Sequence, residues 1–223
     1  SQWNNATICG PRARDVMRAL GTDFDVTPRA LSFMGCADGH VAGIPARVVR
    51  VSFTGELSFE INVAPRHLAA LWDKIMQVGA PFGIAPIGSE ANHVLRVEKG
   101  FLSLGHEVDG TVDPFDLGLG WVMSKNKPDY LGKHAVALRR SGTRNRRELV
   151  GVLPEPDQMI PEGAPLTPLG ARKPTEGLVT ACVFSTVNNR WVGLALLENG
   201  QSRHGETVHV RLRDKIIAAR VTR

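Results

Sequence analysis

The sequence predicts an α+β protein made of two units, and three patterns along the chain lead to this prediction. Between residues 11 and 138, helical patterns are interleaved with one pair of β-rich segments. From residue 149 onward, the patterned segments are short and β-rich. Residues 139–147 lie between these parts and hold five arginines in nine residues, a composition typical of a solvated linker. We therefore expect one unit over residues 1–140, an Arg-rich linker over residues 139–147, and an all-β unit over residues 148–223.

Length and composition restrict the class of protein. The chain has 223 residues, of which 43% are hydrophobic and 22% charged, values typical of a folded globular protein rather than a disordered or fibrous one. The formal net charge of +5 favours anionic partners without indicating nucleic acid. No apolar run approaches the roughly 18 residues of a membrane helix, and the first residues do not resemble a signal peptide. These features predict a cytoplasmic protein that does not associate with membranes.

The first unit begins with a short helix and a hairpin. Pro11 followed by apolar residues at helical spacing predicts a helix that ends before Gly21. Residues 46–53 and 57–63 are β-rich and are separated by Thr-Gly-Glu, which predicts a tight hairpin. In the second of these strands, Glu60 falls on the face opposite to the apolar residues. The pattern therefore places one carboxylate in the middle of a strand.

Three further helices are predicted in this unit. The first starts at Pro65, and its apolar residues at positions i, i+3, i+4, i+7 and i+8, including Trp72, are expected to face the core. The second follows Ser89, a plausible N-cap, and ends before Gly100. The third covers residues 132–138. The stretch from Gly105 to Gly120, which is rich in acidic and turn residues, predicts an ordered loop.

The C-terminal unit shows five short β runs, with a hairpin predicted between the last two. These runs predict a small barrel or sandwich. They cover residues 149–153, 178–184, 191–197, 207–212 and 216–221.

Self-contained catalytic and metal-binding motifs are missing from the sequence. The three cysteines lie far apart and form no C-x-x-C pair, and the seven histidines include no H-E-x-x-H motif, so no metal site is predicted. The pair Gly118 and Gly120 lacks the third glycine of a dinucleotide-binding loop. The segment from Ser124 to Lys127 matches S-x-x-K, but its basic context is typical of a turn rather than of a nucleophile.

Four segments, in order and spacing, resemble the aminomethyltransferase (glycine-cleavage T-protein) superfamily. Residues 88–101 and 109–118 are also similar to the C-terminal region of the alpha subunit of heterotetrameric sarcosine oxidases. The resemblance covers nearly the whole chain. It implies the second half of a folate-binding domain, followed by a small C-terminal β-barrel. The four segments are Arg-Val-Ser-Phe-Thr-Gly-Glu-Leu-Ser-Phe-Glu-Ile (50–61), Leu-Arg-Val-Glu-Lys-Gly (95–100), Asp-Pro-Phe-Asp-Leu-Gly-Leu-Gly-Trp (113–121) and Tyr-Leu-Gly-Lys (130–133).

The resemblance also implies binding residues. Glu60 takes the place of the carboxylate that binds the pterin, which presents two adjacent N–H donors that one carboxylate can accept together. Phe53 stands where glycine-cleavage members carry Tyr, and Trp121 is a candidate for stacking on the ligand. Asn92 is a further candidate for ligand binding, because it stands where the family carries an Arg, although it does not offer the folate tail the cation of that Arg. The family's catalytic Asp lies outside this chain, and we assign no catalytic residue.

The activity implied by the resemblance is the oxidative demethylation of sarcosine to glycine. Its C1 unit passes to tetrahydrofolate, giving 5,10-methylenetetrahydrofolate. Flavin and NAD are expected in the complete enzyme, outside this chain, so the chain alone should contain no flavin and oxidise no amine. The expected partners are the remainder of a longer parent chain, the other subunits of a heterotetramer and the folate. The chain begins and stops abruptly, as a piece of a longer protein would.

Two alternatives remain open at this stage. Within the same superfamily, the chain resembles the corresponding region of an aminomethyltransferase or of a dimethylglycine dehydrogenase. From another class, a non-catalytic module of this fold could bind RNA or protein through its arginines, although nucleic acid is not the expected partner. We also expect the core face of the hairpin over residues 46–63 to be partly uncovered, so that the chain self-associates or requires another segment.

Overall fold

The computed structural model describes residues 2–142, 145–168, 175–213 and 215–223. Its internal contacts divide the chain into an N-terminal unit, residues 1–96, and a C-terminal unit, residues 97–223. Each unit is described separately. No helix in the described part of the chain is long and apolar enough to cross a membrane.

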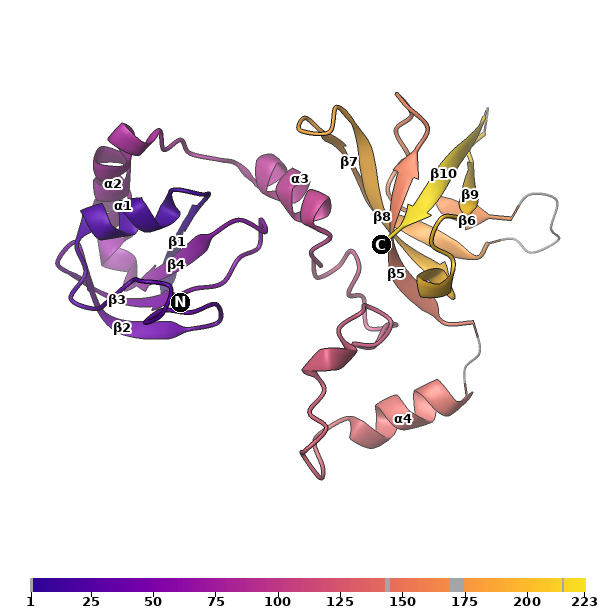
Figure 1. Cartoon of the computed structure of the whole chain (residues 1–223), viewed down its shortest axis with the longest axis horizontal. Coiled ribbons are helices and arrows are strands. Elements are labelled where there is room, and N and C mark those ends of the chain that lie inside the picture. Colours follow the sequence, from indigo (N-terminus) through magenta and orange to yellow (C-terminus); the bar gives the residue numbers. More distant parts are fainter. Residues whose placement is uncertain (1, 143–144, 169–174, 214) are drawn as a thin grey trace. The chain divides into compact units, whose positions relative to one another are not determined.

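The N-terminal unit is built on a four-stranded antiparallel sheet with the strand order β1-β4-β3-β2 (Figure 1). The sheet is completed by β1 and β2, two strands that the sequence analysis did not predict. Helices α1 (Ala13–Leu20) and α2 (Leu68–Gly79) contribute most of the rest of this unit's core, to which Val26 and Leu31 also belong. The strands are β1 (Asn4–Cys9), β2 (Cys36–Val41), β3 (Ile44–Val49) and β4 (Ser58–Val63).

The hairpin is confirmed as an antiparallel pair, but its loop is longer than predicted. β3 ends at Val49, so Phe53 lies in the loop that leads to β4 and not in a strand. The Ser52 hydroxyl accepts a hydrogen bond from the Gly55 N–H at 2.9 Å, and Gly55 has a φ of 84°. Such a side-chain turn offers the backbone an alternative to strand pairing. This local bond explains why the β-rich run stops early.

The core face of this sheet is covered, which makes the expectation of a partly uncovered hairpin wrong. Val48, Phe59 and Ile61 have no exposed surface. They pack in one cluster with residues of α1 and α2, among them Met17 and Leu71. Full burial of large apolar side chains is the main favourable term in folding. The two helices of this chain therefore provide the cover that the sequence analysis expected from another segment.

The third and fourth helices are α3 (Ser89–Lys99) and α4 (Lys133–Gly142). α3 begins where the sequence predicted it, whereas α4 continues four residues beyond the predicted end and includes part of the expected linker. Between them the chain forms turns and one 3-10 turn at Gly120–Val122. The prediction of an ordered loop over residues 105–120 agrees with this description.

The C-terminal unit contains a closed six-stranded barrel with the strand order β10-β5-β8-β7-β6-β9. The predicted barrel and the α+β class are confirmed. All five predicted runs are strands, and the short β6 closes the barrel by pairing with both β7 and β9. The interior is apolar and includes Val152, Leu166 and Leu197, none of them exposed. The strands are β5 (Arg147–Pro154), β6 (Pro165–Thr167), β7 (Gly177–Ser185), β8 (Arg190–Glu198), β9 (Thr207–Arg211) and β10 (Ile216–Thr222).

Candidate functional site

The N-terminal unit contains a cavity of about 890 Å³. This volume lies within the range of about 300–1,000 Å³ that is typical of small-molecule sites. Its walls come from β1, β4, α2, the loop before β4 and the first turn of α3. Three residues that the sequence analysis assigned to ligand binding line this cavity together: Glu60, Phe53 and Asn92.

Glu60 is the central polar residue of the cavity. Strand alternation places its side chain opposite to those of Phe59 and Ile61, which are fully buried in the core. In the sheet, Glu60 is paired with Thr7 of β1 on one side and with Val49 of β3 on the other. Its carboxylate makes no hydrogen bond or ion pair to any residue that the structure describes. An ionised carboxylate only accepts hydrogen bonds, so it is available to a ligand that donates them.

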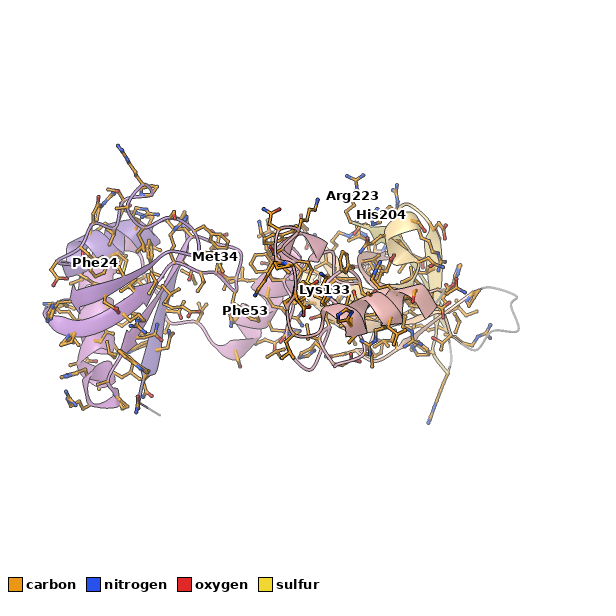
Figure 2. The ribbon with its side chains drawn as sticks, turned by 90° about the horizontal axis from the view of Figure 1, so that it is seen from below. Phe24, Met34, Phe53, Lys133, His204 and Arg223 are labelled. Atoms are coloured by element: carbon orange, nitrogen blue, oxygen red, sulfur yellow. The ribbon has the colours of Figure 1, made fainter. Side chains whose placement is uncertain are left out.

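Aromatic side chains form part of the cavity wall. Phe53 is 39% exposed and lies in the loop before β4 (Figure 2). Trp72 also lines the cavity and is 45% exposed, so its predicted place in the core is wrong. α2 buries Leu71 and Ile75 instead. The apolar stripe of this helix is wider than its core contact, and Trp72 lies at the edge of the stripe, which periodicity alone does not distinguish from its centre.

The charges around the cavity are acidic. Asp73 of α2 lines it in addition to Glu60, and none of the described residues that line it is Lys, Arg or His. Asn92, in the first turns of α3, lines the cavity at the position where the family carries an Arg. The cavity therefore receives no positive charge from this position. The cavity therefore favours a ligand that presents hydrogen-bond donors or positive charge.

Several cavity residues were missed because β1 was not recognised in the sequence. Asn5, Thr7 and Cys9 all line the cavity from this strand. The Thr7 hydroxyl donates a hydrogen bond to Asn5 Oδ1 at 2.7 Å, and the Asn5 amide donates to Asn62 Oδ1 at 3.2 Å. The alternation of polar Asn5, Thr7 and Cys9 with buried Ala6 and Ile8 is the signal that could have revealed the strand.

Trp121, the fourth predicted binding residue, belongs to the C-terminal unit. It lies in the 3-10 turn Gly120–Val122 and is 79% exposed. Trp121 is not among the residues that line the cavity of the N-terminal unit. Its predicted stacking role stays a prediction.

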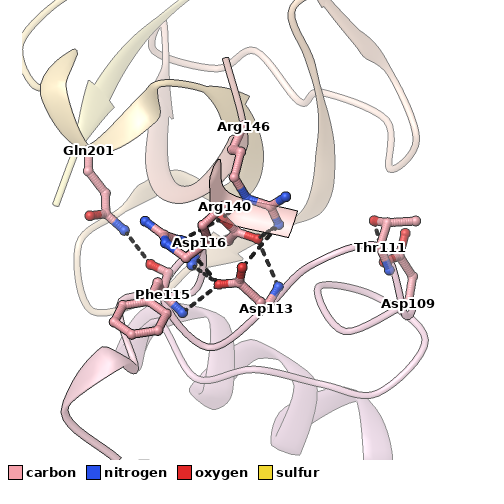
Figure 3. Close-up of polar contacts among 8 residues, drawn as sticks. All are labelled: Asp109, Thr111, Asp113, Phe115, Asp116, Arg140, Arg146 and Gln201. Carbon is pink, nitrogen blue, oxygen red and sulfur yellow. Dashed lines mark hydrogen bonds and ion pairs between the residues drawn. The ribbon is translucent and has the colours of Figure 1, made fainter. Parts of the chain in front are cut away.

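A second polar cluster, in the C-terminal unit, joins Asp113 and Asp116 to Arg140 and Arg146 (Figure 3). The Arg146 guanidinium donates two hydrogen bonds to the Asp116 carboxylate, one of them from Nε at 2.7 Å. Arg140 Nη1 lies 3.3 Å from Asp113 Oδ1. Within residues 139–147, predicted to be a solvated linker, these two arginines are paired with carboxylates, and the side chain of Arg146 is only 13% exposed. The predicted domain bounds themselves stay predictions.

Burial and hydrogen bonding act in opposite directions on Asp116. Burial raises the pKa of the Asp116 carboxyl, but the hydrogen bonds from Arg146 and from the Asp113 backbone N–H outweigh it, so the pKa lies below its usual value. The hydrogen bond with Asp116 in turn raises the pKa of Arg146. Both groups are therefore held in their charged forms. Because the charges of Asp116 and Arg146 are paired with each other, we interpret this cluster as one that stabilises the fold rather than as a binding site.

A metal centre is not indicated within the described ranges, which hold no group of three or more His, Cys, Asp or Glu placed to bind one ion.

Two family models match successive parts of the chain. The family model described as "GCVT N-terminal domain" matches residues 1–127. The model described as "Glycine cleavage T-protein C-terminal barrel domain" matches residues 147–223, which include all six strands of the barrel.

Curated relatives include sarcosine oxidase alpha subunits and aminomethyltransferases. The alpha subunit of sarcosine oxidase from Corynebacterium sp. (strain P-1) is 40% identical over 97% of this chain and 23% of its own length. The aminomethyltransferase of Caldanaerobacter subterraneus subsp. tengcongensis is 31% identical over 95% of this chain and 55% of its own length. The chain thus spans about a quarter of the first relative and little more than half of the second.

A solved structure has the same fold. The glycine cleavage system aminomethyltransferase T from Bartonella henselae superposes with a TM-score of 0.84 and 25% sequence identity. The superposition covers 100% of this chain and 59% of that protein.

Proposed function

Since the chain belongs to the glycine cleavage T-protein family, we propose that it is the folate-binding region of a sarcosine oxidase-type enzyme. Sequence identity supports the choice of sarcosine oxidase over aminomethyltransferase within this family. Three sarcosine oxidase alpha subunits are 36% to 40% identical to this chain, whereas five aminomethyltransferases are 28% to 31% identical.

The observation that carries the proposal is Glu60 in the cavity, with a carboxylate that has no partner among the described residues. A reduced pterin carries a ring N–H next to an amino group, and the two oxygens of Glu60 accept both donors in one plane. Phe53 and Trp72 offer apolar surface to a flat ring system. The acidic lining suits the donor-rich pterin. It does not suit the glutamate tail, which is then expected to extend toward solvent.

The role of this chain is to hold the acceptor of the one-carbon unit. Bound tetrahydrofolate supplies two nitrogens between which a carbon at the oxidation level of formaldehyde is captured. Glu60 fixes the orientation of the pterin, and the apolar walls limit the access of water to it. Oxidation of the amine is assigned to a flavin outside this chain, and no catalytic residue is assigned within it.

The expected surroundings follow from the same assignment. The partners are further sequence of a longer parent protein and the other subunits of an oligomeric enzyme, located in the cytoplasm. An aminomethyltransferase or a dimethylglycine dehydrogenase is the alternative within the family. Comparison of sarcosine, dimethylglycine and an aminomethyl-carrying protein as substrates of the complete enzyme would distinguish the three.

The proposal is tested by calorimetric titration of this chain with tetrahydrofolate under reducing conditions. Glu60→Gln keeps the shape but places an amide donor against a donor of the pterin. The loss should be on the order of 1.5 to 3 kcal/mol, or about 10- to 150-fold in affinity. Glu56→Gln is the matched control, because Glu56 is an exposed carboxylate in the neighbouring loop and does not line the cavity. Equal affinity of the Glu60→Gln variant and the unmodified chain would refute the role of Glu60.

Two arginines of the arginine-rich segment give little support to the alternative of RNA binding. Arg140 and Arg146 are engaged with Asp113 and Asp116, which leaves them unavailable to phosphates. A salt-dependent RNA-binding titration tests this alternative, because phosphate contacts give a steep loss of affinity with salt.

A further inference from the structure

Glu60 has a hydroxyl neighbour in the sheet that does not bond to it. Thr7 is the direct partner of Glu60 in the β1–β4 pair. The N–H of Gly10 donates to the carbonyl of Leu57 at 2.9 Å, and because bonding alternates from there, no backbone hydrogen bond joins Thr7 to Glu60. Side chains approach most closely at such positions, with Cβ atoms about 4.5–5.5 Å apart. The Thr7 hydroxyl thus lies beside the carboxylate, yet it donates its proton elsewhere.

The proton of Thr7 is held by a series of polar side chains on the same face of the sheet. Asn62 Nδ2 donates to the backbone carbonyl of Arg47 at 3.3 Å, and because a carbonyl only accepts, this bond sets the orientation of the Asn62 amide. Asn62 Oδ1 accepts a hydrogen bond from Asn5 Nδ2 at 3.2 Å, which turns the oxygen of Asn5 toward Thr7. Asn5 Oδ1 then accepts a hydrogen bond from the Thr7 hydroxyl at 2.7 Å. Each group in the series is therefore oriented by the one before it.

This series determines what Thr7 offers to a ligand. A hydroxyl has one proton and two lone pairs. Since the proton of Thr7 is donated to Asn5, its oxygen is left to accept a further hydrogen bond. Thr7 and Glu60 both line the cavity, so three acceptor oxygens lie next to one another on its wall.

The other neighbours of Glu60 do not offer an acceptor of this kind. Its partner in β3 is Val49, which has no hydrogen-bonding side-chain atom and is not among the residues that line the cavity. Ser58, two residues earlier in β4, also lines the cavity, but no described residue accepts its proton, so its hydroxyl can donate as well as accept. Across the strands, a ligand held by Glu60 therefore meets a further acceptor toward β1 and not toward β3.

We propose that Thr7 is a specificity-determining residue of this cavity, whose oxygen accepts the second N–H of the pterin amino group while Glu60 accepts the first together with the ring N–H. Three acceptors then meet three donors, and the amino end of the ring faces β1. Asn5 and Asn62 are positioning residues that act through Thr7. The inference rests on the proposed function and names the feature that the cavity recognises, an amino group with both protons. An analogue without that group leaves acceptors unpaired and is rejected.

The first test is calorimetric titration of the full chain with tetrahydrofolate and with its 2-deamino-2-methyl analogue, which lacks both amino protons. Thr7→Val replaces one β-branched residue with another and removes only the oxygen, so tetrahydrofolate should bind about two- to tenfold more weakly. The analogue should bind equally to the Thr7→Val variant and to the unmodified chain. Thr7→Ser, which retains the hydroxyl, should retain the affinity for tetrahydrofolate. Thr7→Ala serves the same comparison if the valine variant does not fold.

The second test examines the positioning role of Asn5. Asn5→Ala releases the Thr7 proton, which Glu60 is then able to accept, so tetrahydrofolate should bind more weakly. Because Asn5 acts through Thr7, Asn5→Ala should cause no further loss of affinity in the Thr7→Val background. Additive losses in the double variant would show that Asn5 contacts the ligand itself and would overturn its positioning role.

The outcomes separate this inference from the proposed function. Unchanged tetrahydrofolate affinity of the Thr7→Val variant, together with a lower affinity of the Glu60→Gln variant, would overturn the inference and leave the proposed function in place. Equal weakening of both ligands by Thr7→Val would also overturn the inference, because the loss would not depend on the amino group. A lack of tetrahydrofolate binding by the unmodified chain would refute the proposed function and the inference with it.

Discussion

Glu60 and Asp116 are both carboxylates in the interior of a unit, but their surroundings are opposite. Asp116 is 1% exposed and is held by Arg146 and by the backbone of Asp113. Glu60 is half-buried, lines an 890 Å³ cavity and has no partner among the described residues. A buried charge must be paired to be tolerated, whereas a charge facing a cavity can exchange water for a ligand.

Charge pairing thus separates a carboxylate that stabilises the fold from one that is available to bind a ligand. Changes around Asp116 should alter the stability of the C-terminal unit. Changes at Glu60 should alter ligand affinity and leave stability nearly unchanged.

Arg146→Met should have the largest effect. It leaves the carboxylates of Asp113 and Asp116, which are 3% and 1% exposed, without their main counter-charge. Removal of one partner from a buried pair costs about 3–5 kcal/mol. Urea denaturation followed by hydrogen exchange in β5 would measure the loss. Arg139→Met, at an exposed position of α4, is the matched control and should change stability little.

Asp116→Asn should have an intermediate effect and should alter the pH dependence. The folded-state pKa of Asp116 lies below its usual value, so its contribution to stability is complete above about pH 4 to 5 and is lost as the pH falls through the folded-state pKa. The free energy of unfolding of the C-terminal unit should decrease with falling pH below about 4. Asp116→Asn should lower stability by about 1–3 kcal/mol at pH 7 and flatten this decrease. An unchanged acid profile would contradict the assignment.

Arg140→Met should cost less than Arg146→Met. The side chain of Arg140 is 39% exposed, compared with 13% for Arg146, and its guanidinium also stacks 4.6 Å from the centre of the Phe115 ring. Partly exposed pairs contribute up to about 1 kcal/mol. Equal losses for Arg140→Met and Arg146→Met in the same denaturation experiment would show that burial does not control this cluster.

Glu60→Gln should have the smallest effect on stability, within about 0.5 kcal/mol, because no described residue depends on its charge. Thermal unfolding would measure this alongside the folate titration. A large loss of stability would place Glu60 with Asp116 as a structural acid.

Local sequence patterns were sufficient to predict several features of this protein. Strand alternation predicted that Glu60 lies opposite to Phe59 and Ile61, and the five short β runs predicted five of the six strands of the barrel. These features depend on a period of two along a single strand, which neighbouring segments do not change. The spacing of the motifs also led to the family, because its segments remain in order along the chain.

The tertiary structure decided which residues of a periodic pattern are buried and which charged residues are paired. Nothing local in α2 distinguishes Trp72 from Leu71. The packing of α2 on the core of the N-terminal unit buries Leu71 and leaves Trp72 in the cavity wall. Arg140 and Arg146 look solvated in sequence because their carboxylate partners lie about 30 residues away. The alternation of polar and apolar residues in β1 is a local signal, but its position in the sheet beside β4 is decided only by its pairing with that strand. A sequence determines local periodicity, but burial and charge pairing depend on contacts between distant segments, which form only when the chain folds.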